Sequence, residues 1–252
     1  MNHEAKAVLL ITGASRGIGA ATALLAGARG YAVGVNYRND DRAAEAVVRQ
    51  IEQAGGMAVA LQADVAREQD VLDLFEACAH RLGAITGLVN NAGILERQST
   101  LAAMEMDRIR RVFETNVFGT MLCAREAVRR MATSTGGSGG GIVNVSSAAS
   151  RLGSPGEYID YAAAKGAVDT FTIGLAKEVA AEGIRVNAVR PGFIETEIHA
   201  SGGEPDRIGR VKAGIPLQRG GRPGEVAEAI LWLLSPESSY TTGSFIDVSG
   251  GK

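Results

Sequence analysis

The stretch AVLLITGASRGIG, residues 7–19, decides the fold of this chain. Residues 7–12 form a short apolar run that predicts a buried strand, and residues 17–29 have the pattern of a helix. Glycines let the connecting turn approach a phosphate closely, and the start of a helix offers free N–H groups and the positive end of its dipole. The stretch therefore predicts a strand, a turn and a helix suited to binding a pyrophosphate.

The glycine spacing in this turn departs from the commonest dinucleotide fingerprint. Gly13, Gly17 and Gly19 follow the pattern Gly-x-x-x-Gly-x-Gly rather than Gly-x-Gly-x-x-Gly. On its own, such a turn is equally compatible with a strand-to-helix connection that binds nothing. The prediction of a dinucleotide site therefore depends on residues elsewhere in the chain.

Short apolar runs alternate with segments of helical period along the rest of the sequence. The expected strands are 32–37, 57–62, 87–90, 142–146 and 185–190, and the expected helices are 42–54, 68–81, 109–131 and 161–181. Parallel strands need crossover connections, so this alternation predicts an α/β fold: a single Rossmann-type, doubly wound parallel sheet with helices on both faces. Residues 134–141, almost all Gly, Ser and Thr, are interpreted as a flexible loop, so that residues 1–252 form one cofactor-binding and catalytic domain.

Composition narrows the class of function. The 252 residues carry a net charge of −2 with scattered basic residues, which argues against a nucleic-acid or membrane-surface partner and favours a small-molecule substrate. Met1 to Lys6 are polar and no apolar run is long enough to cross a membrane, so we expect a cytoplasmic protein. Cys78 and Cys123 are predicted to be buried thiols, and no metal site is expected.

The end of the second expected strand indicates which cofactor is bound. Residues 35–38 read Val-Asn-Tyr-Arg, without the acidic residue that hydrogen-bonds an NAD ribose. Arg38 follows the strand and Arg16 lies in the glycine turn, so two guanidinium groups can meet a 2′-phosphate. We therefore predict NADP(H) rather than NAD(H). The alternative for Arg38 is a solvated charge beside Asp40 and Asp41.

Tyr161 and Lys165 are candidates for proton transfer. They are four residues apart in Tyr-Ala-Ala-Ala-Lys, whose alanines favour a helix, so the phenol and the ammonium group share one face. A nearby cation favours the phenolate and lowers the pKa of a tyrosine towards neutrality, where it exchanges protons efficiently. An isolated Tyr-x-x-x-Lys is nevertheless more often an incidental contact on an amphipathic helix.

Three further features strengthen this prediction. The expected strand 142–146 leads into the hydroxyl groups of Ser146 and Ser147, and residues 90–93, Asn-Asn-Ala-Gly, end another strand in the same way. Ligands of parallel sheets bind beyond the carboxyl ends of the strands. Asn116 lies in the middle of an expected helix, where its amide competes with backbone hydrogen bonds.

Together these pieces make the chain resemble the short-chain dehydrogenase/reductase family over nearly its whole length. The matching pieces are residues 12–19, Asp64-Val65, residues 90–93, Asn116, Ser146-Ser147, Tyr161-x-x-x-Lys165 and Pro191-Gly192. The chain is similar to the NADP(H)-preferring branch that includes 3-oxoacyl reductases and glucose dehydrogenases. The resemblance implies hydride transfer between NADP(H) and a carbonyl or secondary alcohol.

The resemblance also implies roles for individual residues. Tyr161 would be the general acid in reduction and the general base in oxidation, Ser147 would hydrogen-bond the substrate oxygen, and Lys165 would lower the tyrosine pKa and hold the nicotinamide ribose. Asn116 would hold a water that feeds a proton relay to Lys165. The implied cofactor-binding residues are Gly13, Ser15, Arg16, Gly17, Ile18, Gly19, Tyr37, Arg38, Asp64, Val65, Asn91, Ala92, Gly93, Tyr161, Lys165, Pro191, Gly192, Ile194 and Thr196.

One departure from the family bears on the catalytic serine. Ser147 is fourteen residues before Tyr161, whereas many members place this serine thirteen before. Side chains alternate along a strand, so only one of Ser146 and Ser147 can face the cleft, and we choose Ser147.

The segment 197–222 is rich in Gly, Pro and charge, and we expect it to be a lid over the substrate, with a solvated surface excursion as the alternative. His199, Glu204, Asp206 and Arg207 lie in it, but their spacing indicates no role. The resemblance implies a homotetramer. A non-catalytic NADP(H) sensor and a lyase or dehydratase remain alternatives, and within the redox class both 3-oxoacyl-thioester reduction and sugar oxidation stay open.

Overall fold

The computed structural model of the protein describes residues 7–252 as one seven-stranded parallel sheet with the strand order β3-β2-β1-β4-β5-β6-β7. Met1 to Lys6, which carry part of the prediction about targeting, lie outside the described residues. The strands are β1 (Val8–Ile11), β2 (Ala32–Tyr37), β3 (Met57–Gln62), β4 (Ile85–Asn90), β5 (Gly140–Val145), β6 (Ile184–Pro191) and β7 (Phe245–Val248). The sheet grows outward in both directions from β1 and β4, so the strand order reverses between these two neighbours.

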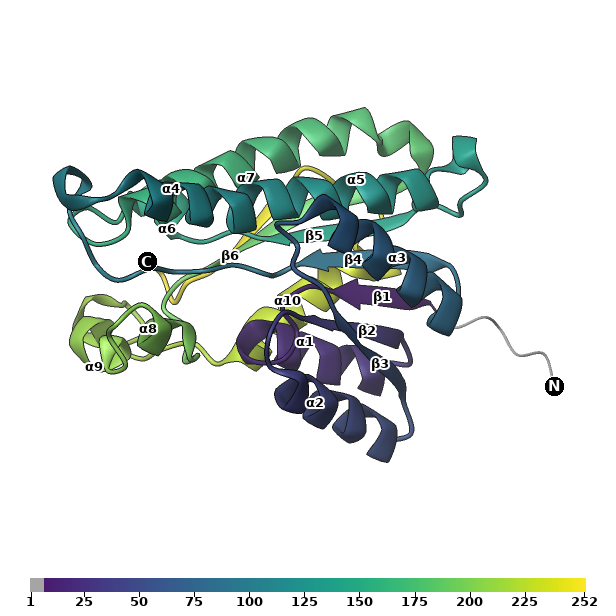
Figure 1. The fold of residues 1–252 in the computed structure, drawn as a ribbon, viewed down its shortest axis with the longest axis horizontal. Helices are drawn as coiled ribbons and strands as arrows, with labels where there is room; N and C mark the ends of the chain where they lie inside the picture. The colour runs from purple at the N-terminus through teal and green to yellow at the C-terminus, as the bar shows by residue number, and fades with distance from the viewer. Residues whose placement is uncertain (1–6) are drawn as a thin grey trace.

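Helices cover both faces of the sheet (Figure 1). One face packs against α1 (Gly17–Ala28), α2 (Asp41–Gln53) and α10 (Pro223–Leu234), and the other against α3 (Glu68–Leu82), α5 (Gly119–Met131) and α7 (Ile159–Glu178). Side chains alternate along each strand, so Leu10 of β1 enters one apolar cluster and Leu9 the other. The predicted doubly wound fold is confirmed.

The elements expected from the sequence agree closely with those of the structure, with one informative difference. The expected helix 109–131 is two helices, α4 (Met106–Phe113) and α5, joined without a break in direction by a π-helical turn, Glu114–Phe118. Such turns leave backbone groups without their usual α-helical partners and are frequent at functional sites. Asn116, which stood out in the sequence, lies within this turn.

The C-terminal third of the chain contains elements that our sequence analysis did not predict. They are α8 (Ile198–Ser201), α9 (Arg207–Val211), α10 and β7. The N-terminus of α10 has a clear physical cause, because Pro223 occupies its first turn and the Glu225 side chain accepts a hydrogen bond from the backbone N–H of Arg222 at 2.7 Å. Helix α10 then packs along α1 beneath β5 and β6.

The glycine-rich segment 134–141 differs from the flexible loop that we predicted. Its start is fixed by Glu182, whose carboxylate accepts hydrogen bonds from the backbone N–H of Ser134 at 2.9 Å and from the Thr133 hydroxyl at 3.3 Å. At Gly137 a Cβ atom would lie 2.4 Å from the Met131 backbone, and at Gly140 it would lie 2.2 Å from the Thr86 carbonyl oxygen. The glycines therefore permit close backbone approach in an ordered connection.

Across residues 7–252, no helix is both long and apolar enough to cross a membrane. Within the same range, no group of three or more His, Cys, Asp or Glu side chains gathers to hold a metal ion. Cys78 and Cys123 are both buried free thiols, as predicted.

We expect Gly140→Ala to lower the free energy of unfolding by about 2 kcal/mol or more, because the added methyl group must displace the Thr86 backbone. The exposed neighbour Ser138 provides the control, and Ser138→Ala should change stability by less than about 0.5 kcal/mol. Urea unfolding followed by circular dichroism measures both. Equal stability of the two variants would contradict this account of the loop.

Candidate active site

The candidate site is a groove at the carboxyl ends of the strands, above the point between β1 and β4 where the strand order reverses. It has two connected parts, which share Ile18, Asn91, Gly93, Thr196 and Ile198 among their lining residues. One part lies over the glycine turn and the ends of β2 and β3, and the other lies beside β5, β6 and α7. Open parallel sheets bind ligands in this position.

The glycine turn is shaped for close approach of a phosphate. Gly13 and Gly17 have φ values of +60° and +57°, which favour glycine, and both line the groove. Gly19 lies beneath the groove, and a Cβ atom there would come within 2.4 Å of the Gly13 carbonyl oxygen. The N-terminus of α1 opens into this space, so the turn fits the pyrophosphate of a dinucleotide.

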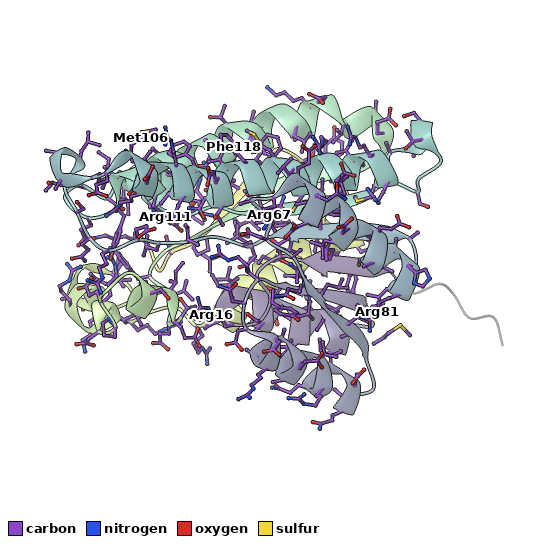
Figure 2. The ribbon with its side chains drawn as sticks, viewed as in Figure 1. Arg16, Arg67, Arg81, Met106, Arg111 and Phe118 are labelled. Carbon is purple, nitrogen blue, oxygen red and sulfur yellow. The ribbon has the colours of Figure 1, made fainter. Side chains whose placement is uncertain are left out.

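The part of the groove at the ends of β2 and β3 contains the remaining residues expected to meet the adenosine half of a cofactor. They are Ser15, Arg16, Tyr37, Arg38, Asp64, Val65 and Ala92. Arg16 is exposed beside the start of α1, as Figure 2 shows, and Arg38 is exposed with its guanidinium group 3.7 Å from the Asp64 carboxylate. Arg38 is therefore an exposed cation that one carboxylate partly neutralises.

Tyr161, Lys165 and Ser147 meet in the other part of the groove. Tyr161 and Lys165 are one turn apart on α7, with the lysine Nζ 5.6 Å from the centre of the tyrosine ring. Burial raises the pKa of Tyr161, while a hydrogen bond with the Ser147 side chain and the charge of Arg207 act in the opposite direction. The net pKa shift is upward, contrary to our expectation that Lys165 would lower it.

The reason lies in the position of the Lys165 ammonium group. Its Nζ donates a hydrogen bond to the Val145 carbonyl oxygen at 2.7 Å, and the side chain is buried. Burial lowers the pKa of Lys165 to about 8, although the negative charge of Asp169 opposes this shift. Lys165 is therefore held against the end of β5, where its charge is easily lost.

The two neighbouring serines have different surroundings. The Ser146 hydroxyl is buried and donates to the Asp169 carboxylate at 2.6 Å, which in turn accepts from Arg190 at 3.0 Å. The Ser147 hydroxyl lies in the cleft with Tyr161 and accepts a hydrogen bond from the Ala149 backbone at 3.1 Å. The short helix α6 (Ala149–Leu152) and the turn after it accommodate the longer spacing to Tyr161.

Asn116 lies below the groove rather than in its wall. Its side-chain oxygen accepts from the Ile94 N–H at 2.8 Å and its amide donates to the Ile94 carbonyl at 3.0 Å. A Cβ atom on Gly93 would lie 2.8 Å from the Asn116 Oδ1 and 3.7 Å from the Lys165 Nζ. Asn116 therefore fixes the segment after β4 close to Lys165.

The expected nicotinamide-side residues Pro191, Gly192, Ile194 and Thr196 line the same cleft. Thr196 lies against the glycine turn, since a Cβ atom on Gly17 would be 3.3 Å from its methyl group. Of the predicted site residues, the structure thus brings all into the groove except Gly19 and Asn116, which support it from below.

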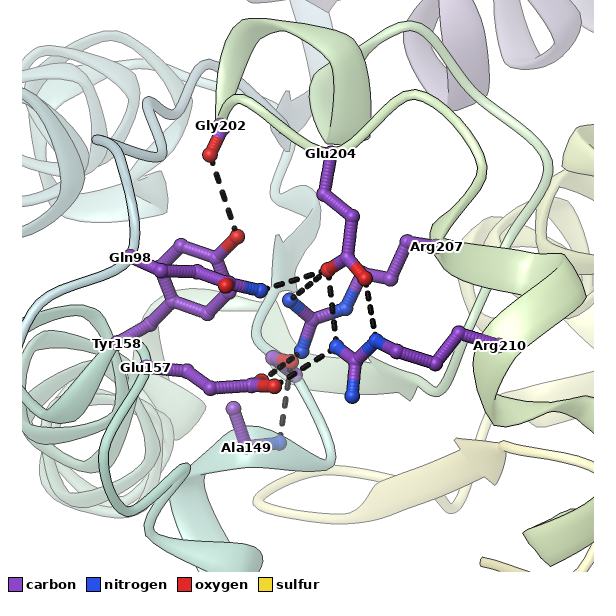
Figure 3. A network of polar contacts seen from close by, with 9 residues as sticks. Gln98, Ala149, Glu157, Tyr158, Gly202, Glu204, Arg207 and Arg210 are labelled. Atoms are coloured by element: carbon purple, nitrogen blue, oxygen red, sulfur yellow. Dashed lines mark hydrogen bonds and ion pairs between the residues drawn. The ribbon is translucent and has the colours of Figure 1, made fainter.

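Sequence reasoning missed the residues that close the outer part of the cleft, among them Leu152, Tyr158, Phe193, His199 and Arg207. Arg207 is buried over the rings of Tyr158, at 4.6 Å, and Phe193, at 5.4 Å. Figure 3 shows its ion pairs with Glu157 and Glu204, which also bind Arg210. The mixed charges of segment 197–222 were the available signal, but one of the two carboxylates, Glu157, comes from elsewhere in the chain.

Comparisons with known proteins agree with this geometry. The sequence model of the family described as "Enoyl-(Acyl carrier protein) reductase" matches residues 13–252. The "Uncharacterized oxidoreductase YgfF" of Escherichia coli K12 is 61% identical over 246 residues, which cover 98% of this chain and 100% of that protein. A 3-oxoacyl-[acyl-carrier-protein] reductase of Synechocystis sp. is 42% identical, with 97% of this chain and 96% of that protein covered.

A crystal structure of a short-chain type dehydrogenase/reductase from Mycobacterium marinum superposes with a TM-score of 0.91 at 36% identity, covering 97% of this chain and 94% of that one. The chain belongs to the short-chain dehydrogenase/reductase family. It is an oxidoreductase of the class that uses a nicotinamide cofactor.

The surroundings of Lys165 generate a prediction about its protonation. The wild-type ammonium group should titrate at about pH 8, and Asp169→Asn should lower this pKa further, because the carboxylate charge that opposes the effect of burial is removed. An NMR titration of the lysine side-chain signals measures both values. Asp107→Asn, an exposed change on α4, is the control and should leave the titration unchanged, whereas an unaltered midpoint in Asp169→Asn would contradict the proposed effect.

Proposed function

We propose that the protein transfers a hydride between NADP(H) and a carbonyl or secondary alcohol substrate, with Tyr161 as the general acid and base. The observation that carries this proposal is the meeting of Ser147, Tyr161 and Lys165 at one end of a groove whose other end lies over a glycine turn. The groove thus offers a place for a dinucleotide, and proton-transfer groups at the point where its reactive ring would end.

Tyr161 and Ser147 have different roles in the proposed reduction of a carbonyl group. The bound cofactor supplies the hydride to the carbonyl carbon. Tyr161 gives its phenolic proton to the carbonyl oxygen, while the Ser147 hydroxyl donates a hydrogen bond to the same oxygen. Because burial raises its pKa, Tyr161 stays protonated at neutral pH, which supports the role of an acid in reduction.

Lys165 and Asn116 complete the proposed proton path. The Lys165 ammonium group, which donates to the Val145 carbonyl, would hold the nicotinamide ribose of a bound cofactor and would supply a positive charge beside Tyr161 that favours proton exchange there. Asn116 supports this path by holding a water beside Lys165. The segment 197–222, which carries α8 and α9 over the cleft, serves as the substrate lid.

The preference for NADP(H) rests on Arg16 and Arg38. Both line the groove beside the end of β2, where Tyr37 stands instead of an acidic residue. A 2′-phosphate would replace Asp64 as the partner of Arg38 and gain charge-assisted hydrogen bonds that an NAD ribose does not form.

The homotetramer and the cytoplasmic location stay predictions. Apolar side chains that are exposed in the single chain gather along α4, the π-helical turn and α5. Figure 2 labels two of them, Met106 and Phe118, the second of which is 54% exposed. Exposed apolar side chains on such helices are compatible with a subunit interface.

Replacement of the catalytic groups tests the proposed function. We expect wild-type protein to oxidise NADPH in the presence of carbonyl compounds, and Tyr161→Phe and Ser147→Ala to lower kcat by about 100-fold or more. Ser146→Ala is the matched control: it should lower kcat far less than Ser147→Ala, because the Ser146 hydroxyl donates to Asp169 and not to the substrate oxygen. Binding of NADPH without turnover would favour a sensor, and product formation without a change in cofactor absorbance would favour a lyase.

The cofactor preference has a separate test. Arg38→Gln should raise KM for NADPH by about tenfold or more while KM for NADH changes little, because the lost contact is to the 2′-phosphate alone. Arg49→Gln, an exposed change further along α2, should alter neither value. Equal catalytic efficiency of the wild type with NADPH and NADH would show that the two arginines do not discriminate.

A further inference from the structure

His199 on α8 is a buried polar side chain at the wall of the cleft. It is 9% exposed, and its Nε2 lies 2.8 Å from the Ile194 carbonyl oxygen. A carbonyl oxygen only accepts hydrogen bonds, so the Nε2 atom must carry the proton of this contact. The contact therefore fixes which nitrogen of a neutral ring is protonated.

The surroundings of the ring favour its neutral form. Burial lowers the pKa of His199, and the positive charge of Arg207 acts in the same direction, whereas the contact with Ile194 and the charge of Glu204 oppose them. With the proton on Nε2, the Nδ1 atom presents a lone pair. No residue of the described range 7–252 donates a hydrogen bond to this buried Nδ1. A buried acceptor without a hydrogen-bond donor destabilises the protein until a donor binds to it.

The remaining wall of this part of the cleft is mainly apolar. Leu95, Leu152, Tyr158, Phe193 and Ile198 line it together with His199 and Arg207. The Arg207 guanidinium group is engaged by the carboxylates of Glu157 and Glu204, so its charge is held in place beside the histidine. A neutral hydroxyl group on a ligand can supply the donor that Nδ1 lacks.

We propose that the Nδ1 atom of His199 accepts a hydrogen bond from a hydroxyl group of the substrate, so that the enzyme selects hydroxy-substituted carbonyl compounds with an apolar body. This inference rests on the proposed function and names the substrate class of the same site. Nδ1 is enclosed in the position of α8 seen here, so the contact requires α8 to shift and open Nδ1 to the cleft when the substrate binds.

The test compares substrates that differ only in a donor. Cyclohexanones bearing a hydroxyl group at C3 or C4 are matched with their methoxy analogues, which keep the oxygen but cannot donate. Wild-type kcat/KM should favour at least one hydroxy compound by about tenfold, the effect of one neutral hydrogen bond. In His199→Leu the side chain is apolar and has no acceptor, and the preference should fall to about one.

His80→Gln, an exposed change on α3, is the control and should retain the wild-type ratio. A second measurement needs no variant: the ¹⁵N resonance of Nδ1 in the wild type should shift when the preferred hydroxy compound is added and stay unchanged with its methoxy analogue. Turnover with equal efficiency for hydroxy and methoxy compounds, or the same ratio in His199→Leu as in the wild type, overturns the inference while the proposed function stands. If the ¹⁵N resonance of Nδ1 shifts but no NADPH is oxidised, the proposed function is overturned and the hydrogen bond to Nδ1 is supported.

Discussion

The ends of β1 and β4 are joined by hydrogen bonds between their first residues beyond the sheet. The Asn91 amide donates to the carbonyl oxygens of Thr12 and Gly13, each at 2.9 Å, and the Thr12 hydroxyl accepts from the backbone N–H groups of Asn91 and Ala92, each at 3.0 Å. Because the strand order reverses here, the helices that follow the two strands leave on opposite faces. The junction therefore holds open the crevice in which both parts of the groove lie.

A second network of buried hydrogen bonds connects β4 and β5 to α7, the helix on which Tyr161 and Lys165 lie. The Asn90 amide donates to the Asn144 side chain at 2.9 Å, and the Asn144 amide donates to the Thr172 hydroxyl of α7 at 2.9 Å. Buried amides are costly unless they are paired, so sliding α7 by one turn would leave these groups unsatisfied. The network thus fixes the position of α7 along its axis, and with it the height of Tyr161 and Lys165 above the sheet.

The sequence was sufficient to predict six of the seven strands and most of the groove because both depend on local patterns. The alternation of short apolar runs with helical periods gives the strands, and the polar residues at strand ends meet wherever parallel strands end together. It did not predict the contacts of Arg207, because Tyr158 and Glu157 lie far from it in the chain. It also did not predict the burial of His199, which depends on the packing of the whole cleft. Helix α10 was missed although Pro223 and Glu225 carry a start signal, and the pKa direction of Tyr161 was missed because burial outweighs the neighbouring charges.

The interactions that hold the outer cleft together differ from those that stabilise the sheet. Glu157, Glu204, Arg207 and Arg210 hold segment 197–222 to the loop before α7 by ion pairs, whereas the sheet is held by buried apolar side chains. Dissolved salt screens partly exposed charges over about 10 Å at 0.1 M and leaves apolar contacts intact or stronger. Ionic strength is therefore a physical variable that acts on access to the substrate cleft separately from the folding of the molecule.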